Sequence, residues 1–377
     1  MEPLTLAVVL FALSFLHGMV VEQWRERLAQ ARSGPGEGTA ASYDSLTIIV
    51  PTRNAAGTLI PLLQDLHAQD LPKERVEVLV VDDHSEDDTA AVVHSMGLKW
   101  PELRCISNDG VGKKAAITTG VTHASGEVIL LTDADARCGV SRASTVLKWM
   151  NAQGMDMALA AVRTEGDGLL GRIQEEEQAG LTGMAIGSAL QGRPFLANGA
   201  NMAFTRKAFA EVRGYQGDPY ASGDDVFLVQ RMKRAGKRIG YVVSTEAVVS
   251  VAAERTWGMA IQQRLRWAGK MRGVRGMTPW VGSLGLALPW ALLLGTWQIA
   301  PRLFMEERTL EPFALLLLSW LLWCVPAVRL VREVKAFLSQ RHSNFVAFLG
   351  LVLFSLYAPL IALLSWVVRP QWKGRKT

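Results

Sequence analysis

The stretch VILLTDADARCG, residues 128–139, decides the fold of this chain. Its four apolar residues, Val128–Leu131, predict a buried strand that runs straight into Asp133 and Asp135. In an open α/β sheet, ligands bind beyond the carboxyl ends of the strands, which is where these two acids lie. Side chains two apart share a face in an extended segment, so both carboxylates can approach one divalent cation that carries a diphosphate. The alternative is that both aspartates are turn or capping residues.

Composition places this motif in a membrane-attached protein. The 377 residues are enough for one large domain or two, and long uncharged stretches stand at both ends of the chain. The excess of five positive charges gathers beside these stretches, which favours a cytoplasmic membrane surface over nucleic acid. The three cysteines lack metal-ligand spacing, and their odd number makes a disulfide framework improbable.

The ends of the chain predict membrane helices. Leu4–Val21 is uncharged, long enough to span a bilayer and followed by arginines, so we expect an anchor with the N-terminus outside rather than a cleaved signal peptide. Three more apolar segments follow late in the chain: Trp280–Ala300, Phe313–Val328 and Phe345–Val368. The connection Arg329–His342 and the tail Arg369–Lys376 are both basic and both favour the cytoplasm. If all three segments crossed the membrane, the connection and the tail could not both lie in the cytoplasm. One segment is therefore expected to be re-entrant or interfacial.

Between the apolar ends, strands and helices alternate as in a mostly parallel sheet. The expected strands are Leu46–Pro51, Val76–Val81, Leu103–Ser107, Val128–Leu131, Met157–Val162 and one or two within Ile239–Val251. Helices are expected at Thr58–Gln69, near Arg142–Ala152 and at Leu169–Gln191. The small-residue spacing of this last helix, with Gly180, Gly183 and Gly187, indicates close packing against another helix or a membrane-proximal wall.

Several polar groups fall where these elements begin or end. Asp83 closes the second strand and can accept hydrogen bonds from a base or ribose, or can serve as a cap. Gly110–Gly120, with two lysines, opens a helix that suits an anion, although solvated lysines are an equal alternative. Gly199 and Asn201 indicate a tight backbone feature beside the cleft. In SGDDVFL, residues 222–228, the acids are helix caps or include a general base.

A basic helix at Thr256–Val274 has two faces. Its apolar side can lie on anionic lipid, and its other side can grip a phosphate and stack on a sugar. The apolar side carries Trp257, Ile261, Leu265 and Ala268, and the other carries Gln263, Arg266, Trp267 and Lys270.

Taken in order, these motifs resemble those of a membrane-anchored family 2 glycosyltransferase over about residues 45–273. IIVPTRN and VVDDHSEDDT resemble nucleotide-binding strand ends, DAD resembles the D-x-D motif, GDD stands at the acidic pair, and QRLRW matches Q-x-x-R-W. The resemblance implies an α/β fold of the GT-A type: a Rossmann-like, mostly parallel sheet with helices on both faces, plus N- and C-terminal transmembrane helices. It divides the chain into an anchor (1–22), a juxtamembrane linker (23–44), a catalytic domain (45–255), an amphipathic interfacial helix (256–278) and C-terminal membrane segments with a basic tail (279–377).

The resemblance also implies roles for individual residues. Asp225 would be the catalytic base, and Asp133 and Asp135 would engage a divalent metal, Mn²⁺ or Mg²⁺. Asp133 would also contact the diphosphate of a nucleotide-sugar donor, with UDP as the first choice of nucleotide. The remaining donor-binding residues would be Pro51, Thr52, Asp83, Lys113, Gln263, Arg266 and Trp267.

The tail Trp372–Arg375 resembles the W-K/R-G-R ending of relatives that glycosylate lipids, including ceramide and carotenoid glycosyltransferases, although a basic-aromatic membrane anchor would look the same. We therefore expect an inverting enzyme, multi-pass in the inner (cell) membrane, that moves a sugar to a lipid or lipid-linked acceptor at the cytoplasmic face. The alternatives are a processive polysaccharide synthase and a catalytically silent, nucleotide-binding membrane scaffold.

Overall fold

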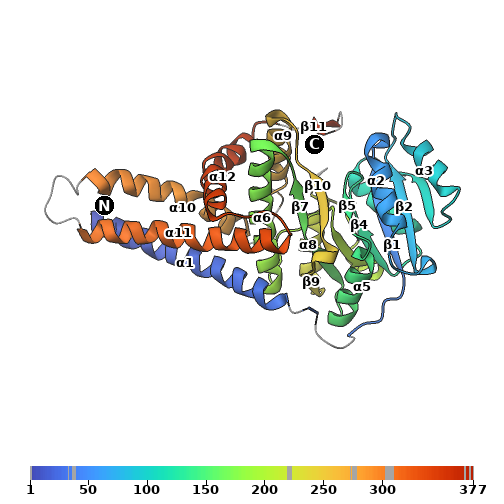
Figure 1. Ribbon diagram of the computed structural model, residues 1–377, viewed down its shortest axis with the longest axis horizontal. Helices are drawn as coiled ribbons and strands as arrows, with labels where there is room; N and C mark the ends of the chain where they lie inside the picture. The colour runs from blue at the N-terminus through green and yellow to red at the C-terminus, as the bar shows by residue number, and fades with distance from the viewer. Residues whose placement is uncertain are drawn as a thin grey trace.

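The computed structural model describes residues 2–32, 34–35, 40–218, 223–271, 273, 278–301, 310–368, 371–372 and 375–376. It consists of an α/β sheet domain and an elongated group of apolar helices that projects from one side of it (Figure 1). Some residues of the predicted motifs lie outside this range: residue 222 of the acidic motif, residue 274 of the basic helix, and residues 369, 370, 373 and 374 of the tail.

The centre of the sheet domain is a seven-stranded sheet in the order β3-β2-β1-β4-β8-β6-β9. β8 runs antiparallel to its neighbours β4 and β6, whereas the other pairs are parallel, so the predicted mostly parallel sheet is confirmed. β4 is the strand of the opening motif, and all four of its residues are buried. The strands are β1 Leu46–Thr52, β2 Val76–Asp82, β3 Leu103–Ser107, β4 Val128–Leu131, β6 Met157–Ala160, β8 Met202–Thr205 and β9 Ile239–Val242.

A second sheet of three strands, in the order β5-β10-β7, lies beside the first. Its strands are β5 Arg137–Cys138, β7 Val162–Glu165 and β10 Val249–Ala252. The single strand predicted at 157–162 is therefore wrong, because the chain changes sheets at Ala161 and its two halves belong to β6 and β7. A continuous apolar run cannot show such a change, since both halves are buried.

Helices and short 3₁₀ turns connect the strands. α4 packs tightly on β1, because a Cβ at Gly120 would lie 2.8 Å from the side chain of Ile49. The connecting elements are α2 Ala56–His67, η1 Lys73–Arg75, α3 Thr89–Gly97, α4 Lys113–His123, α5 Arg142–Gln153, α7 Arg206–Glu211, α8 Asp224–Arg234 and η2 Thr245–Ala247.

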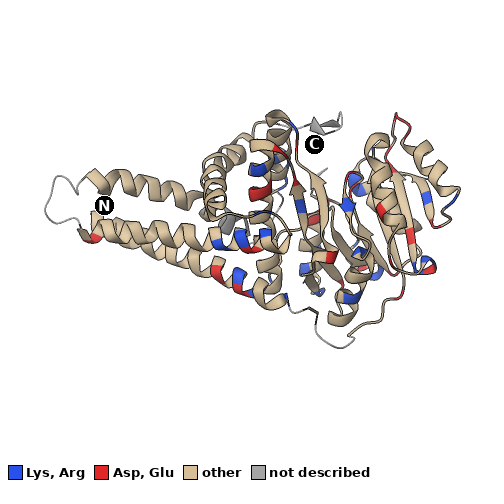
Figure 2. Ribbon diagram, in the orientation of Figure 1, with Lys and Arg blue, Asp and Glu red and all other residues tan. Residues whose placement is uncertain are grey.

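Three apolar helices run side by side away from the domain: α1 Pro3–Ala31, α10 Thr278–Ile299 and α11 Leu310–Phe337 (Figure 1). A fourth, α12 Asn344–Leu364, lies at the domain end of this bundle against α6 Gly168–Leu190 and α9 Trp257–Met271. In length and composition α1, α11 and α12 suit a bilayer crossing, and 285–299 of α10 form a shorter apolar helix. Figure 2 shows charged residues over the sheet domain and the adjoining end of the bundle, whereas the bundle beyond is mostly uncharged.

Two of the helices continue past the predicted membrane segments. α1 extends into the predicted juxtamembrane linker as far as Ala31, and α11 extends through most of the predicted basic connection to Phe337. The reason is packing, because these extensions bury Leu28 and Val334 completely in the same apolar core as the sheet. Two short strands, β11 Gln371–Trp372 and β12 Arg375–Lys376, pair in the tail.

α6 joins the bundle to the domain through its small residues. A Cβ at Gly183 would lie 3.0 Å from Leu330 of α11, and one at Gly187 would lie 2.2 Å from Trp24 of α1. The predicted close packing of this helix against another helix is therefore confirmed. The backbone of α6 approaches both apolar helices more closely than larger side chains would allow.

Candidate active site

The ends of β1 and β2 meet beside the turn that precedes α4. Asp83 is buried and accepts hydrogen bonds from Asn108 Nδ2 at 2.7 Å and from the amide of Gly112 at 2.9 Å. Thr52 is also buried and donates from Oγ1 to the carbonyl of Val81, while its neighbour Pro51 is half-buried. These contacts shape one side of the predicted cleft around Gly112, whose φ of +92° suits glycine.

The acids after β4 do not form an extended segment. The amide of Ala136 bonds back to the carbonyl of Asp133, so the chain turns through Ala134 and Asp135. The extended geometry predicted for this pair is therefore wrong, because a tight turn replaces the alternation of a strand. Asp133 is half-buried and Asp135 is exposed. Their role as metal ligands remains a prediction.

Lys113, the first residue of α4, connects two of the predicted acidic motifs. Its Nζ lies 2.7 Å from Oδ1 of Asp133 and 3.1 Å from Oδ2 of Asp224. Burial by itself would lower the pKa of Lys113, but the two carboxylates outweigh it and raise that pKa. Burial would likewise raise the pKa of Asp224, and the lysines at 113 and 270 lower it instead. The cluster is therefore held in its charged form.

The acidic pair opens α8 directly after Gly223, whose φ is +86°. Both carboxylates are buried, and Asp225 lies 2.8 Å from Nζ of Lys270 on α9. The tight feature predicted at Gly199 is confirmed, since a Cβ there would lie 2.4 Å from Oδ2 of Asp224. Only glycine therefore allows the 199 backbone to pass so close to the acid.

α9 brings its basic side chains over the same cluster. Burial lowers the pKa of Arg266. Nearby carboxylates, which include Asp133 and Asp224, raise this pKa by a smaller amount. Gln263 differs from its neighbours on the predicted polar face, because its Nε2 donates to Glu254 at 3.0 Å and its Oε1 accepts from Arg264 at 2.7 Å. Trp267 lies beneath the guanidinium of Arg264, with 5.2 Å between the guanidinium carbon and the ring centroid.

The structure thus places Lys113, Asp133, Asp225 and Arg266 near one another at one edge of the sheet, whereas Gln263 turns toward the domain. Their roles in the site remain a prediction. Sequence reasoning gave no role to Arg264, named Lys270 only as one member of the polar helix side, and treated Asp224 only as part of the acidic pair. The sequence could have indicated that Lys270 lies at the site, because it shares a helical face with Arg266. No sequence pattern could have indicated the ion pair between Asp224 and Lys113, since 111 positions separate them in the chain.

The candidate site offers few protein ligands to a metal. Among the described residues no three His, Cys, Asp or Glu side chains gather closely enough to hold a metal ion. The carboxylates of Asp133 and Asp135 are the hard oxygen ligands that Mg²⁺ or Mn²⁺ takes, and such ions commonly complete their coordination with phosphates and water. These two residues therefore fit a metal that arrives with a diphosphate.

Comparisons with known proteins show which family and which fold this chain resembles. Residues 47–213 match the family described as Glycosyl transferase family 2. A dolichyl-phosphate beta-glucosyltransferase of Trichomonas vaginalis is 34% identical over 96 residues, which cover 24% of this chain and 28% of that protein. A 4,4'-diaponeurosporenoate glycosyltransferase of Staphylococcus haemolyticus is 31% identical over 125 residues, covering 33% and 32%. The chain thus spans about a third of the length of these relatives or less.

Among solved structures, the fold is similar to that of a mannosyltransferase from Pyrobaculum calidifontis in complex with GDP-Man and Mn²⁺. The TM-score is 0.58 at 20% identity, and the match covers 94% of this chain and 99% of the other. The sheet domain therefore has the GT-A fold, and its residues 47–213 match glycosyltransferase family 2, a family of enzymes.

Proposed function

We propose that this protein transfers a sugar, with inversion, from a nucleotide-sugar donor to a lipid or lipid-linked acceptor. One observation carries the proposal: Asp133, Asp224 and Asp225 converge with Lys113, Arg266 and Lys270 at the edge of the sheet where ligands of α/β proteins bind. A protein that only holds a nucleotide has no need of a buried carboxylate beside its phosphate-binding cations. The first choice of donor is a UDP-sugar.

In this proposal Asp225 is the general base. The ammonium of Lys270 lies 2.8 Å from its carboxylate and fixes the direction of that side chain. Asp225 takes the proton of the acceptor hydroxyl, whose oxygen attacks the anomeric carbon while the bond from that carbon to the diphosphate breaks. Attack from the side opposite the leaving group inverts the configuration of that carbon.

The leaving nucleoside diphosphate gains negative charge during this step. Arg266 is positioned to meet that charge, because it lies over the same cleft as Lys113 and Asp133. Trp267, the next residue, is assigned to stack on the sugar with the ring face that does not contact Arg264. Asp83, Pro51 and Thr52 form the wall assigned to the nucleoside. A Mn²⁺ or Mg²⁺ ion held by Asp133 and Asp135 supplies further neutralisation of the diphosphate when it is bound.

The membrane helices support a lipid acceptor. α12, one of the helices that suits a bilayer, packs on α9, so the predicted cleft lies next to the apolar part of the molecule. The names of two relatives, a dolichyl-phosphate glucosyltransferase and a diaponeurosporenoate glycosyltransferase, specify lipid-like acceptors. We place the protein in the inner (cell) membrane as a multi-pass protein, with the sheet domain on the cytoplasmic side.

The test is transfer by the purified protein in lipid nanodiscs with Mn²⁺ or Mg²⁺, a panel of labelled UDP- and GDP-sugars and a total lipid extract, read by mass spectrometry. One discrete glycolipid is the expected product, and it names both sugar and acceptor. A long polymer instead would overturn the proposal in favour of a polysaccharide synthase. Nucleotide binding without turnover on any donor would favour a scaffold.

A further inference from the structure

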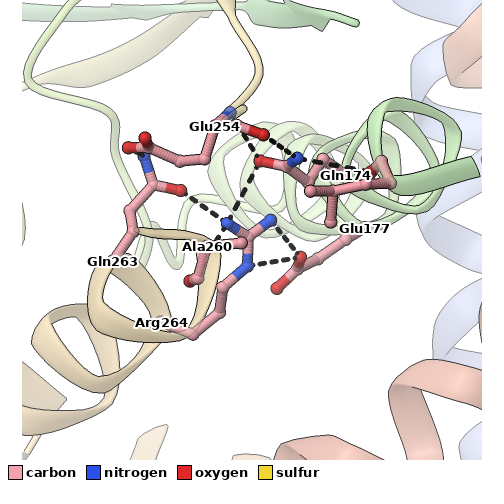
Figure 3. A network of polar contacts seen from close by, with 7 residues as sticks. Gln174, Glu177, Glu254, Ala260, Gln263 and Arg264 are labelled. Carbon is pink, nitrogen blue, oxygen red and sulfur yellow. Dashed lines mark hydrogen bonds and ion pairs between the residues drawn. The ribbon is translucent and has the colours of Figure 1, made fainter. Parts of the chain in front are cut away.

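Behind the Q-x-x-R-W segment, a network of polar side chains connects α9 to α6 (Figure 3). Its centre is Arg264, whose guanidinium lies between Gln263 on one side and Glu177 on the other. Nη2 and Nε of Arg264 donate to Oε2 of Glu177 at 2.6 and 2.9 Å. Only 9% of the Arg264 side chain and 5% of the Glu177 side chain are exposed, so this ion pair is shielded from solvent.

The same guanidinium organises the rest of the segment. Its Nη1 donates to Gln263 at 2.7 Å, and its plane faces the ring of Trp267. Gln263 in turn donates to Glu254, and Glu254 exchanges two backbone hydrogen bonds of 2.9 Å with the side chain of Gln174 on α6. The nitrogen of the Gln263 amide is therefore bound to Glu254 of the domain, and its oxygen is bound to Arg264.

The position of Arg264 on the helix separates it from the cleft. At 3.6 residues per turn, side chains two positions apart differ in direction by about 200°, so Arg264 and Arg266 point to opposite sides of α9. Arg264 faces α6, whereas Arg266 and Lys270 act on the acidic cluster. The contact of Arg264 with α6 on one side of α9 thus fixes the position of the opposite side, which carries Arg266 and Lys270.

We propose that Arg264 and Glu177 are positioning residues: their buried ion pair fixes α9 on α6 and so aligns Arg266 and Lys270 with the reacting groups. Gln263 belongs to this anchor rather than to the donor site. The inference rests on the proposed glycosyl transfer for its kinetic consequence, but the anchoring itself can be measured without any activity.

The experiment uses the full-length protein in nanodiscs and the variants Glu177→Gln, Arg264→Gln and both together. Glu175→Gln is the matched control, because it removes an acid of α6 two residues from Glu177. Its partner Lys335 still pairs with Glu176 in this variant. Hydrogen–deuterium exchange of 257–271 is expected to speed up in each single variant and not in the control. The double variant is expected to exchange more slowly than either single one, since no unpaired charge stays buried.

The kinetic readout is kcat at saturating donor, below the unfolding temperature of every variant. Glu177→Gln is expected to lower kcat roughly tenfold to a hundredfold, as for small misplacements of catalytic groups, while the control stays within about twofold. Unchanged exchange in α9 would overturn the anchor, and faster exchange with unchanged kcat would overturn the positioning role. If the wild-type protein transfers nothing, the proposed function fails, and the exchange measurement still decides the anchor.

Discussion

At the scale of single residues, charge pairing accounts for the state of the candidate site. Lys113 and Lys270 each contact one acid of the pair that opens α8, and Arg266 lies over the same cluster. Three cations thus face acids that would otherwise repel one another in a buried place. The cations also leave the cleft suited to a negatively charged donor.

Asp225→Asn is expected to lower transfer at least about a hundredfold, because the amide cannot accept the proton of the acceptor hydroxyl. Binding of the nucleotide-sugar should change little, since the assigned nucleoside wall around Asp83 is untouched. The two quantities are measured by initial rates and by calorimetric titration of the donor. Lys270→Met serves as the control for the lost ion pair, because it keeps the carboxylate. An equally severe loss of donor binding in Asp225→Asn would show that the residue is structural.

Asp135→Ala tests the metal assignment. Asp135 is exposed in the turn after β4, so its removal is not expected to disturb the fold. Affinity for the nucleotide-sugar should fall in the presence of Mn²⁺ and differ little from wild type after chelation of the metal. Asp88→Ala is the control, since it removes an exposed acid elsewhere. Identical affinities across a Mn²⁺ titration would rule out Asp135 as a ligand.

Glu77 on β2 links three segments and predicts a pH dependence of stability. Burial would raise its pKa, but hydrogen bonds from Ser125, Thr47 and Arg104 outweigh burial and lower the pKa below its ordinary value of 4.5. Because the pKa is lowered in the folded state, ionised Glu77 stabilises the fold above about pH 4.5. This stabilisation is lost as the pH falls through the lowered pKa.

Glu77→Gln should therefore destabilise the protein by about 1 kcal/mol near pH 7, with the difference shrinking below pH 4.5. Thermal unfolding of both proteins between pH 7 and 3.5 measures it. Arg75→Gln is a suitable control for a surface charge change, because Arg75 pairs with the exposed Asp44. A difference that grows as the pH falls would contradict the assignment.

At the scale of elements, α6 is the connection on which the arrangement depends. Its glycines contact α1 and α11, and its consecutive glutamates pair with Lys335 of α11 and with Arg264 of α9. One helix thus touches both the bundle and the helix that covers the cleft.

Gly187→Ala is expected to destabilise the protein by about 1–3 kcal/mol, because the new methyl group would lie 2.2 Å from Trp24 and force α1 and α6 apart. Gly180→Ala is the matched control on the same helix. Its methyl group would meet only Val331, at 3.9 Å, so the higher helix propensity of alanine should leave stability equal or slightly increased. Thermal unfolding in detergent compares the two, and equal losses would show that contact with Trp24 is not the cause.

At the scale of the whole molecule, the bundle and the sheet domain suggest one orientation in the membrane. Arg25, Arg27 and Arg32 follow the apolar part of α1 in the sequence, and this end of the helix adjoins the sheet domain (Figure 1). With an epitope tag before Met1, trypsin added to inverted membrane vesicles should digest the sheet domain and leave the tag protected. Right-side-out vesicles should give the reverse pattern. A protected sheet domain in the inverted vesicles would place it on the opposite side.

The sequence by itself determined the local structure and the composition of the site. Apolar runs that end in polar clusters gave most of the strands, including β3 and β4 at their observed bounds, and alternation gave the mostly parallel sheet. The order of the motifs indicated the family, because strand ends on one edge of a sheet bring their side chains together whatever the intervening sequence.

Only the tertiary structure decided which charges meet and where segments end. The change of sheet at Ala161, the turn at Asp135 and the extension of α1 to Ala31 depend on packing partners far away in the chain. The same holds for the bridge from Lys113 to Asp224 and for the anchor between Arg264 and Glu177. The spacing of apolar residues in the sequence indicates whether a segment is a helix or a strand and which of its faces is buried. The partner of a buried charge is instead set by how the elements pack.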